Sequence, residues 1–274
     1  MSETARDPAP VARTGRRIAL GVSYDGRGYQ GWQSQPSGQT VQDRLERALA
    51  DFACKPISTL CAGRTDAGVH GLMQVVHFDT DIERAPASWV RGTNRFLPPD
   101  IAVQWAQPVP AGFHARASAI ARRYRYVLLE SPVRPSLEAG RVGWVFRPLD
   151  GVAMHAAAAH LIGEHDFSSF RAAECQAASP VKTLTRIDIE RRGAYWRFEF
   201  EANAFLHHMI RNLMGCLVRV GQGLAHPDWM REVLAARSRD AAAPTFAPDG
   251  LYFVGPVYAP HWGLPERVAA YDWA

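Results

Sequence analysis

The sequence has almost no lysine. Its 31 basic residues outnumber its 27 acidic ones, which gives a formal charge of +4 and a pI near 9.0, yet only Lys55 and Lys182 are lysines. Arginine grips phosphate with two parallel N–H groups and stacks on bases, whereas lysine offers a point charge. The charge balance and the choice of base therefore favour an anionic partner.

Cysteine is scarce, and the spacing of the cysteines matches no metal-binding or redox motif. No C-x-x-C occurs, and the four cysteines lie in apolar or helical settings: Cys54, Cys61, Cys175 and Cys216. This pattern predicts free thiols in a reducing compartment, and hence a cytoplasmic location.

Long hydrophobic runs are also missing. No apolar stretch approaches the roughly 20 residues that a membrane-spanning helix needs, so we expect no membrane-embedded part. Residues 1–16 contain Pro, Ala, Ser and Arg but lack the apolar centre of a secretory signal, and we interpret them as a disordered leader.

Several motifs of common enzyme classes are absent. There is no GKS/T for a nucleotide phosphate and no G-x-S-x-G for a serine nucleophile. Of the ten histidines, His207 and His208 are neighbours, and on a helix they would point about 100° apart. The sequence therefore predicts neither a bound metal nor an organic cofactor.

One short stretch, residues 62–71, has a composition unsuited to a core. It reads AGRTDAGVHG and lies between two apolar runs, residues 57–61 and 73–78, that are predicted strands. Its glycines permit close approach of a ligand, so the stretch is suited to holding Asp66 at a fixed position. An ordinary turn, in which the Asp66 side chain bonds its own backbone, explains the stretch equally well.

The order of predicted elements is β-α-β-β-α-β, and it occurs twice. The first set is a strand at 18–24, a helix from 41 to 52 that begins with a Thr40–Asp43 capping box, the two strands just named, a helix at 87–96 and a strand at 101–105. The second set is a strand at 124–129, a helix at 150–162, strands at 184–190 and 195–201, a helix from Asn203, a helix at 227–236 and a strand at 251–258.

This repetition predicts an α+β fold. Two ferredoxin-like lobes would join into one mainly antiparallel sheet, with helices on one face and the active-site cleft between the lobes. We expect an N-terminal lobe at 17–106, a C-terminal lobe at 113–260 with an insertion near 130–149, and a tail at 261–274.

Two segments of the second lobe place arginine beside aromatic or polar side chains. On the strand at 124–129, Tyr124 and Tyr126 share one face, as is common where bases are held on an open sheet; tyrosines packed in the core are the alternative. On the helix from Asn203, one face bears residues spaced by one turn: His207, Arg211, Gly215 and Arg219. A solvated charged face is the ordinary explanation of that row.

Taken together, these blocks closely resemble the bacterial tRNA pseudouridine synthase A family. The resemblance rests on residues 62–71 together with SYDG at 23–26, GWQ at 31–33, RRYRY at 122–126, DFSSF at 166–170 and NAFLHHMIRN at 203–212. It extends from about Arg17 to about Pro260. The family isomerises uridine to pseudouridine at positions 38, 39 and 40 of the tRNA anticodon arm, as a homodimer and without a metal or cofactor.

The resemblance also implies roles for individual residues. Asp66 would be the nucleophile, Arg211 its ion-pair partner, and Tyr124 would stack on the target uracil and take the C5 proton. Arg64 would help to displace or hold the flipped nucleotide, and Leu251 would pack against the base. Candidates for further RNA contacts are Arg27, Arg116, Arg122, His207 and Arg219.

The chemistry agrees with these roles, because a carboxylate is a suitable partner for an electron-poor sugar carbon. The sequence leaves open whether Asp66 attacks C1′, adds to C6 or acts through a glycal intermediate. Two alternative functions remain: a non-catalytic tRNA-binding protein on the same fold, and a carboxylate-based hydrolase, which would need a second catalytic acid.

Overall fold

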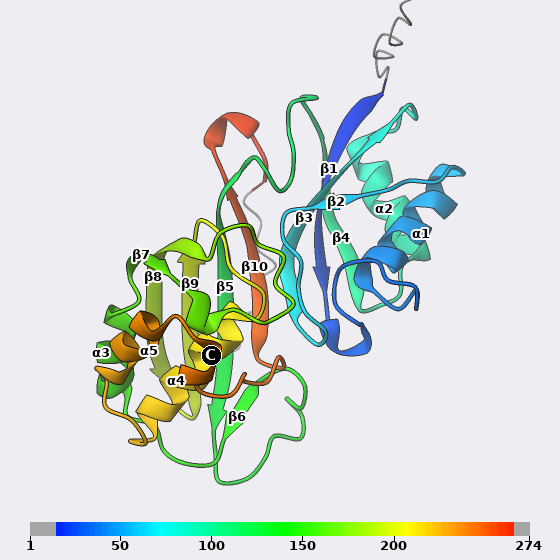
Figure 1. Ribbon diagram of the computed structural model, residues 1–274. Helices are drawn as coiled ribbons and strands as arrows, with labels where there is room; N and C mark the ends of the chain where they lie inside the picture. The colour runs from blue at the N-terminus through cyan, green and yellow to red at the C-terminus, as the bar shows by residue number, and fades with distance from the viewer. Residues whose placement is uncertain (1–14, 266–274) are drawn as a thin grey trace, which may run out of the picture.

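The computed structural model describes residues 15–265 (Figure 1). The first half contains β1 (Arg16–Tyr24), α1 (Val41–Ala53), β2 (Leu60–Cys61), β3 (His70–Thr80), α2 (Pro86–Phe96) and β4 (Ile101–Val109). The second half contains β5 (Ala119–Glu130), β6 (Gly143–Val145), α3 (Gly151–Ala159), β7 (Gly163–Asp166), β8 (Val181–Arg192), β9 (Tyr195–Ala202), α4 (Met209–Gly221), α5 (Trp229–Ala236) and β10 (Leu251–Tyr258).

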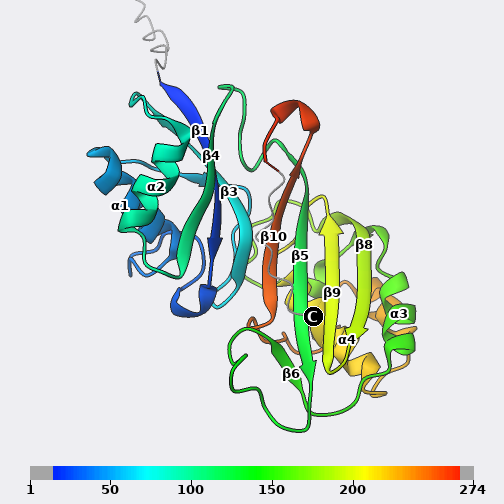
Figure 2. The ribbon, with the colours of Figure 1, turned by 180° about the vertical axis from the view of Figure 1, so that it is seen from behind.

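All of these strands belong to one sheet, whose main order is β4-β1-β3-β10-β5-β9-β8-β7. Strand β2 pairs with β3, so the first lobe has the order β4-β1-β3-β2, and the second repeats it as β10-β5-β9-β8. This is the ferredoxin-like order, and the predicted α+β fold with a mainly antiparallel sheet is confirmed. Seen from behind, the last strand of the chain, β10, lies between the two lobes (Figure 2).

The lobes join through a short parallel pairing of β10 with β3. Only Tyr252 with His70 and Phe253 with Gly71 are in register. On its other edge β10 pairs antiparallel with β5 from Leu251 to Tyr258. The joint therefore lies at the end of the glycine-rich stretch that contains Asp66.

The helices of both lobes pack on the same face of the sheet. In the first lobe α1 covers the side of β1 that bears Leu20 and Tyr24. A Cβ on Gly71 would lie 2.4 Å from the Tyr24 ring, so Gly71 faces that side. Its register partner Phe253 belongs to the core beneath α4, so the two helical layers continue one another across the joint.

Local sequence signals explain most of the elements. The predicted capping box at the start of α1 is present, since Thr40 Oγ1 accepts a hydrogen bond from the Asp43 backbone N–H and the Asp43 carboxylate accepts one from Thr40. Asp150 caps the start of α3, because its side chain accepts a hydrogen bond from the backbone N–H of Ala153.

Several predicted elements differ from the observed ones. The expected strand at 57–61 is reduced to Leu60 and Cys61, because the backbone N–H of Thr59 donates instead to the Glu46 carboxylate, at 2.7 Å. Helix α3 ends at Ala159 and not at 162. The polar strand β7 at 163–166 was not predicted.

A further difference concerns the helix expected from Asn203, which begins only at Met209. The Asn203 side chain accepts hydrogen bonds from the backbone N–H groups of Thr183 and Ala204, and so ties the end of β9 to β8. His208 then has φ +59°, a left-handed conformation that a helix cannot include. Residues 203–208 are consequently a connecting segment.

Some predictions concern residues beyond the described ones. The predicted leader lies outside them except for Gly15 and Arg16, and Arg16 is the first residue of β1. The predicted tail is described only to residue 265. Among residues 15–265, no helix is both long and apolar enough to cross a membrane.

Candidate active site at the junction of the lobes

The loop that contains Asp66 is held by backbone and side-chain hydrogen bonds on both sides. The carbonyl of Thr65 accepts from Trp32 N–H at 3.0 Å, and the Thr65 hydroxyl lies 2.8 Å from the hydroxyl of Tyr24. The Gln74 side chain bonds both the N–H and the carbonyl of Gly63. Asp66 therefore lies on a loop whose shape is fixed by its own lobe.

The loop also contains the turn that the sequence allowed. Val69 N–H donates to the carbonyl of Asp66 at 3.1 Å, and Gly68 has φ +80°, which glycine adopts without strain. The turn is closed by the Asp66 backbone, and the Asp66 carboxylate faces the start of α4. A turn is therefore present, but backbone atoms close it and not the Asp66 side chain that the turn interpretation invoked.

Three cationic or potentially cationic groups contact the Asp66 carboxylate. Nη1 of Arg211 lies 3.2 Å from Oδ2, Nε2 of His208 lies 3.4 Å from Oδ2, and Nε2 of His207 lies 3.4 Å from Oδ1. The Asp66 and Arg211 side chains are 20% and 15% exposed, so the pair is largely removed from solvent yet still reachable.

The ionisation of this cluster follows from the contacts. Burial acts to raise the pKa of Asp66, but the hydrogen bond from His207 and the charges of His208, His207 and Arg211 outweigh it and hold the pKa below the usual 3.8. The hydrogen bond to Asp66 raises the pKa of His207, whereas burial lowers that of His208. At neutral pH the site therefore contains an ionised carboxylate.

The left-handed residue His208 explains how both imidazoles reach one carboxylate. Because residues 207 and 208 precede the helix, their rings are not 100° apart but lie together, with centroids 4.0 Å apart. The geometric argument against a metal site at these two histidines is therefore wrong. Ligand atoms of Asp66, His207 and His208 all lie within 4.8 Å of one another.

Arg211 is oriented by a segment for which the sequence predicts no role. Its Nε donates to the carbonyl of Phe246 at 2.9 Å, and Phe246 N–H donates back to the carbonyl of Arg211. Phe246 lies in the segment 243–250, which we call the bridging segment. Phe246 makes both bonds through its backbone, so its residue type gives no sign in the sequence that it contacts Arg211.

The bridging segment touches both halves of the site. A Cβ on Gly215 of α4 would lie 2.2 Å from the carbonyl oxygen of Pro244, and one on Gly68 of the Asp66 loop would lie 3.1 Å from Pro248. On α4, Gly215 lies one turn from Arg211 and one turn from Arg219, so its lack of a side chain leaves space between these two arginines. The structure shows that this chain's own backbone occupies that space.

His70, at the end of the glycine-rich stretch, joins the loop to its surroundings. It is buried, its Nδ1 accepts from Gly26 N–H at 3.2 Å, and its Nε2 lies 3.0 Å from the carbonyl of Gly140 and 3.2 Å from that of Asp249. Burial lowers the pKa of His70, so the neutral ring with its proton on Nε2 satisfies all of these partners.

Tyr124 and Leu251 lie on the helical face of the sheet beside the site. The Tyr124 ring is 9% exposed and packs between Phe205 and Phe253, at centroid distances of 5.1 and 4.9 Å. Leu251 is 4% exposed in the same core. Tyr124 and Tyr126 face the core, so the alternative of tyrosines packed in the core is the one observed. Tyr124 lies at the margin of this core, where the Asp66 charge acts on it.

The arginines predicted to bind RNA fall into two groups. Arg64 and Arg116 are exposed near the Asp66 loop. Arg27 forms an ion pair with Asp25 at 2.7 Å, and Arg219 lies over the ring of Trp229 on α5, two helical turns beyond Arg211. The structure thus brings the first two near the site and directs Arg219 away from it.

Arg122 has a different environment from these four. Its guanidinium donates to the backbone carbonyls of Ala62, Ala119 and Asn203, at 3.0 to 3.4 Å, and also to that of Arg116. Ala62 begins the Asp66 loop and Asn203 begins the segment that contains the two histidines. Arg122 therefore ties the two sides of the site together.

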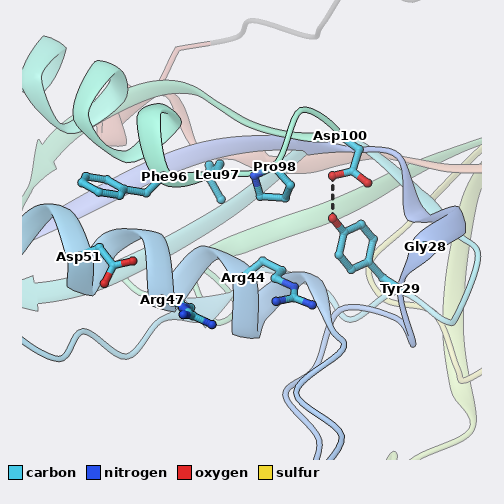
Figure 3. A pocket seen from close by; sticks show the side chains of 9 residues that line it. All are labelled: Gly28, Tyr29, Arg44, Arg47, Asp51, Phe96, Leu97, Pro98 and Asp100. Carbon is cyan, nitrogen blue, oxygen red and sulfur yellow. Dashed lines mark hydrogen bonds between the residues drawn. The ribbon is translucent and has the colours of Figure 1, made fainter.

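The site does not coincide with the pocket in the first lobe (Figure 3). That pocket of about 570 Å³ lies between α1 and the end of α2, and Tyr29 donates a hydrogen bond to Asp100 at its rim, at 2.6 Å. Its lining residues include Arg44 and Arg47 but none of the residues that contact Asp66.

An ionised, largely buried aspartate against an arginine and two histidines is an arrangement typical of enzyme sites that use a carboxylate. A family model described as "tRNA pseudouridine synthase" matches residues 21–116 and 157–259. The chain therefore belongs to the tRNA pseudouridine synthase family.

Curated relatives agree with this family. A protein of Paracidovorax citrulli named "tRNA pseudouridine synthase A" is 72% identical over 94% of this chain and 99% of its own length. One of Polaromonas naphthalenivorans with the same name is 73% identical over the same shares. A solved structure of an "H/ACA RNP bound to a substrate RNA containing 2'-deoxyuridine" is similar at 10% identity and a TM-score of 0.36, over 82% of this chain and 59% of that one, which is too distant to support an inference.

Proposed function

We propose that this protein isomerises uridine to pseudouridine in tRNA, at positions 38, 39 and 40 of the anticodon arm, with Asp66 as its nucleophile. The observation that carries the proposal is the Asp66 carboxylate held ionised by Arg211 and His207 at the junction of the lobes. Family membership and the names of the relatives support tRNA uridine as the substrate.

The reaction breaks the N1–C1′ bond, turns the uracil and forms a C5–C1′ bond. A carboxylate serves attack on C1′, addition to C6 or pairing with a glycal intermediate, and in each case it must be ionised. Arg211 meets that requirement because its charge is permanent, its guanidinium is fixed by Phe246 and it contacts Oδ2 directly.

We assign contact with the uracil ring and acceptance of the C5 proton to Tyr124. Burial, with a further contribution from the Asp66 charge, raises the pKa of Tyr124, so its hydroxyl is protonated at neutral pH. It can accept the C5 proton only while it passes its own proton to water. We therefore propose that the hydroxyl relays a proton, and that the ring holds the base.

The target base must leave the stacked arm of the tRNA to reach this carboxylate, at a cost of a few kcal/mol. Arg64 is exposed two residues before Asp66 and can take the place of the extruded nucleotide or contact its phosphate. Leu251, in the core beside Tyr126, provides an apolar surface below the base. Arg27 and Arg116 would contact the backbone of the arm.

We further propose a homodimer that acts in the cytoplasm, on the resemblance of this chain to its family. The non-catalytic alternative has no support, because the named relatives are synthases and Asp66, Tyr124 and Arg211 are all in place.

The test is release of tritium from tRNA that contains 5-tritiated uridine. Asp66→Asn should lower the rate by about 10⁴-fold or more, as expected for loss of a nucleophile, while tRNA binding is retained. Asp81→Asn is the matched control, because Asp81 is an exposed aspartate paired with Lys55, and it should turn over normally. Normal release by Asp66→Asn would refute the assignment, and wild-type protein that binds tRNA without forming pseudouridine would favour the non-catalytic alternative.

A further inference from the structure

Asp66, His207 and His208 present three metal-ligand atoms to one point in space. Nε2 of His207 and Nε2 of His208 each lie 3.4 Å from an oxygen of Asp66, and all three ligand atoms lie within 4.8 Å of one another. Among residues 15–265, no other trio of histidine, cysteine or acidic side chains meets this condition.

The spacing suits a tetrahedral ion. A Zn²⁺ ion lies about 2.0 Å from imidazole nitrogen and carboxylate oxygen, so two ligands of a tetrahedron are about 3.3 Å apart. Nε2 of His207 lies 3.4 Å from Oδ1 of Asp66 and Nε2 of His208 lies 3.4 Å from Oδ2, so each histidine is close to that separation from one of the two carboxylate oxygens. Two imidazoles with one carboxylate form a donor set that selects Zn²⁺ and similar transition metals over Mg²⁺ or Ca²⁺.

The ligands are also accessible and pre-arranged. The side chains of His207 and His208 are 39% and 28% exposed, so an ion can reach them from solvent. The left-handed conformation of His208 sets both rings on the side of Asp66 before any ion arrives. Binding would therefore require little rearrangement.

We infer that this trio is an inhibitory site for a borderline-soft divalent cation such as Zn²⁺. The inference deepens the proposed function, because the ion would coordinate the same carboxylate that is proposed as the nucleophile. Coordination engages an oxygen lone pair of Asp66 and holds both histidines, so the carboxylate cannot act on the nucleoside. The ion is an inhibitor here and supplies no part of the reaction.

Arg211 limits the strength of this binding. Its Nη1 lies 3.2 Å from Oδ2 of Asp66 and repels a second positive charge. Removing that charge while keeping a polar side chain, as in Arg211→Gln, should strengthen Zn²⁺ binding although it abolishes turnover. This opposite effect on the two properties separates metal binding from catalysis.

The test uses the full chain freed of metal with EDTA. Zn²⁺ binding is measured by calorimetry, Co²⁺ binding by its visible absorption, and turnover by tritium release with and without Zn²⁺. We expect visible bands of low-coordinate Co²⁺, loss of turnover on adding Zn²⁺ and recovery with EDTA, whereas excess Mg²⁺ should neither bind at the trio nor inhibit. His207→Ala and His208→Ala should each weaken Zn²⁺ binding by about tenfold or more.

A second group of histidines provides the control. His160 and His226 both contact Asp228, at 3.2 and 3.4 Å, at the start of α5. His226→Ala should leave Zn²⁺ affinity and its inhibition unchanged.

The outcomes separate the inference from the proposed function. No Co²⁺ bands, affinity unchanged in His207→Ala and His208→Ala, or weaker Zn²⁺ binding by Arg211→Gln would each overturn the metal site. If Asp66→Asn abolishes turnover while wild-type protein binds no Zn²⁺, the proposed function stands and the inference fails. If Zn²⁺ binds at the trio and turnover persists, inhibition is refuted together with the assignment of Asp66.

Discussion

Oδ2 of Asp66 lies 3.2 Å from Nη1 of Arg211, although the two residues are 145 positions apart in the chain. Asp66 belongs to the first lobe and Arg211 to the second, so their contact exists only when the lobes are joined. The bridging segment, residues 243–250, maintains this contact, since the carbonyl of Phe246 accepts a hydrogen bond from Arg211 and Pro248 lies against the loop that bears Asp66.

Replacing Arg211 should abolish turnover and not merely weaken binding. Arg211→Ala removes the permanent charge beside Asp66, and we expect tritium release to fall by at least about 10²-fold, with a smaller change in tRNA affinity. Arg211→Lys should not support normal turnover either, because an ammonium group cannot bond Phe246 and Asp66 in the geometry of a guanidinium group. Arg231→Ala, on the exposed side of α5, is the control. Near-normal turnover by Arg211→Ala would remove Arg211 from the site.

The two parts of the Tyr124 side chain should have separable effects. Tyr124→Phe keeps the ring between Phe205 and Phe253 but removes the hydroxyl, so we expect product formation to fall by about 10²- to 10⁴-fold while tRNA affinity is maintained. Tyr124→Leu should also reduce affinity, because it loses the flat surface for the base. Equal rates for wild type and Tyr124→Phe would exclude the proton relay.

His207 and His208 should titrate on opposite sides of the usual value of 6.5. The hydrogen bond to Asp66 raises the pKa of His207, and burial lowers that of His208. The ion pair of His207 with Asp66 therefore contributes to stability fully below pH 6.5, and this contribution is lost as the pH rises through the higher pKa of the folded protein. Imidazole NMR spectra recorded against pH measure both values.

The same spectra of Asp66→Asn provide the control for this prediction. Without the carboxylate, the pKa of His207 should fall, since its main stabilising partner is gone. A wild-type His207 that titrates at or below 6.5 would contradict the contact.

Gly215 should tolerate no side chain. A Cβ there would lie 2.2 Å from the carbonyl oxygen of Pro244, so either α4 or the bridging segment must move. We expect Gly215→Ala to lower the free energy of unfolding by about 1–3 kcal/mol and to lower turnover, since Phe246 and Arg211 move with the segment. Gly112→Ala, where no atom lies within 4 Å of the new Cβ, should be neutral or slightly stabilising. Urea unfolding of the two variants measures the difference.

The sequence predicts well what depends on local side-chain chemistry. Residue types and their spacing are enough to predict three features: the capping box of Thr40 and Asp43, the alternation along the strand with Tyr124 and Tyr126, and the glycine-rich loop around Asp66. The doubled β-α-β-β-α-β order was sufficient to predict the sheet.

Two features of the site could not be predicted in this way. The left-handed conformation of His208 is set by the tertiary fold, because the enrichment of histidine among left-handed residues does not single out either histidine of the HH pair. The bridging segment contributes through the backbone carbonyl groups of Pro244 and Phe246. Every residue has such a carbonyl group, so the residue types in this segment do not reveal its role. Arg122 was expected to bind RNA, and only the structure shows that its guanidinium is engaged by four backbone carbonyls.

The position of β10 has a consequence for synthesis of the protein. This strand is the last of the sheet to leave the ribosome, yet it lies at the centre, between β3 and β5. A nascent chain that already includes Asp66, Tyr124 and Arg211 has two separate half-domains until residues 251–258 emerge and dock. Because Asp66 contacts Arg211 only when the lobes are joined, we expect no activity before β10 has docked.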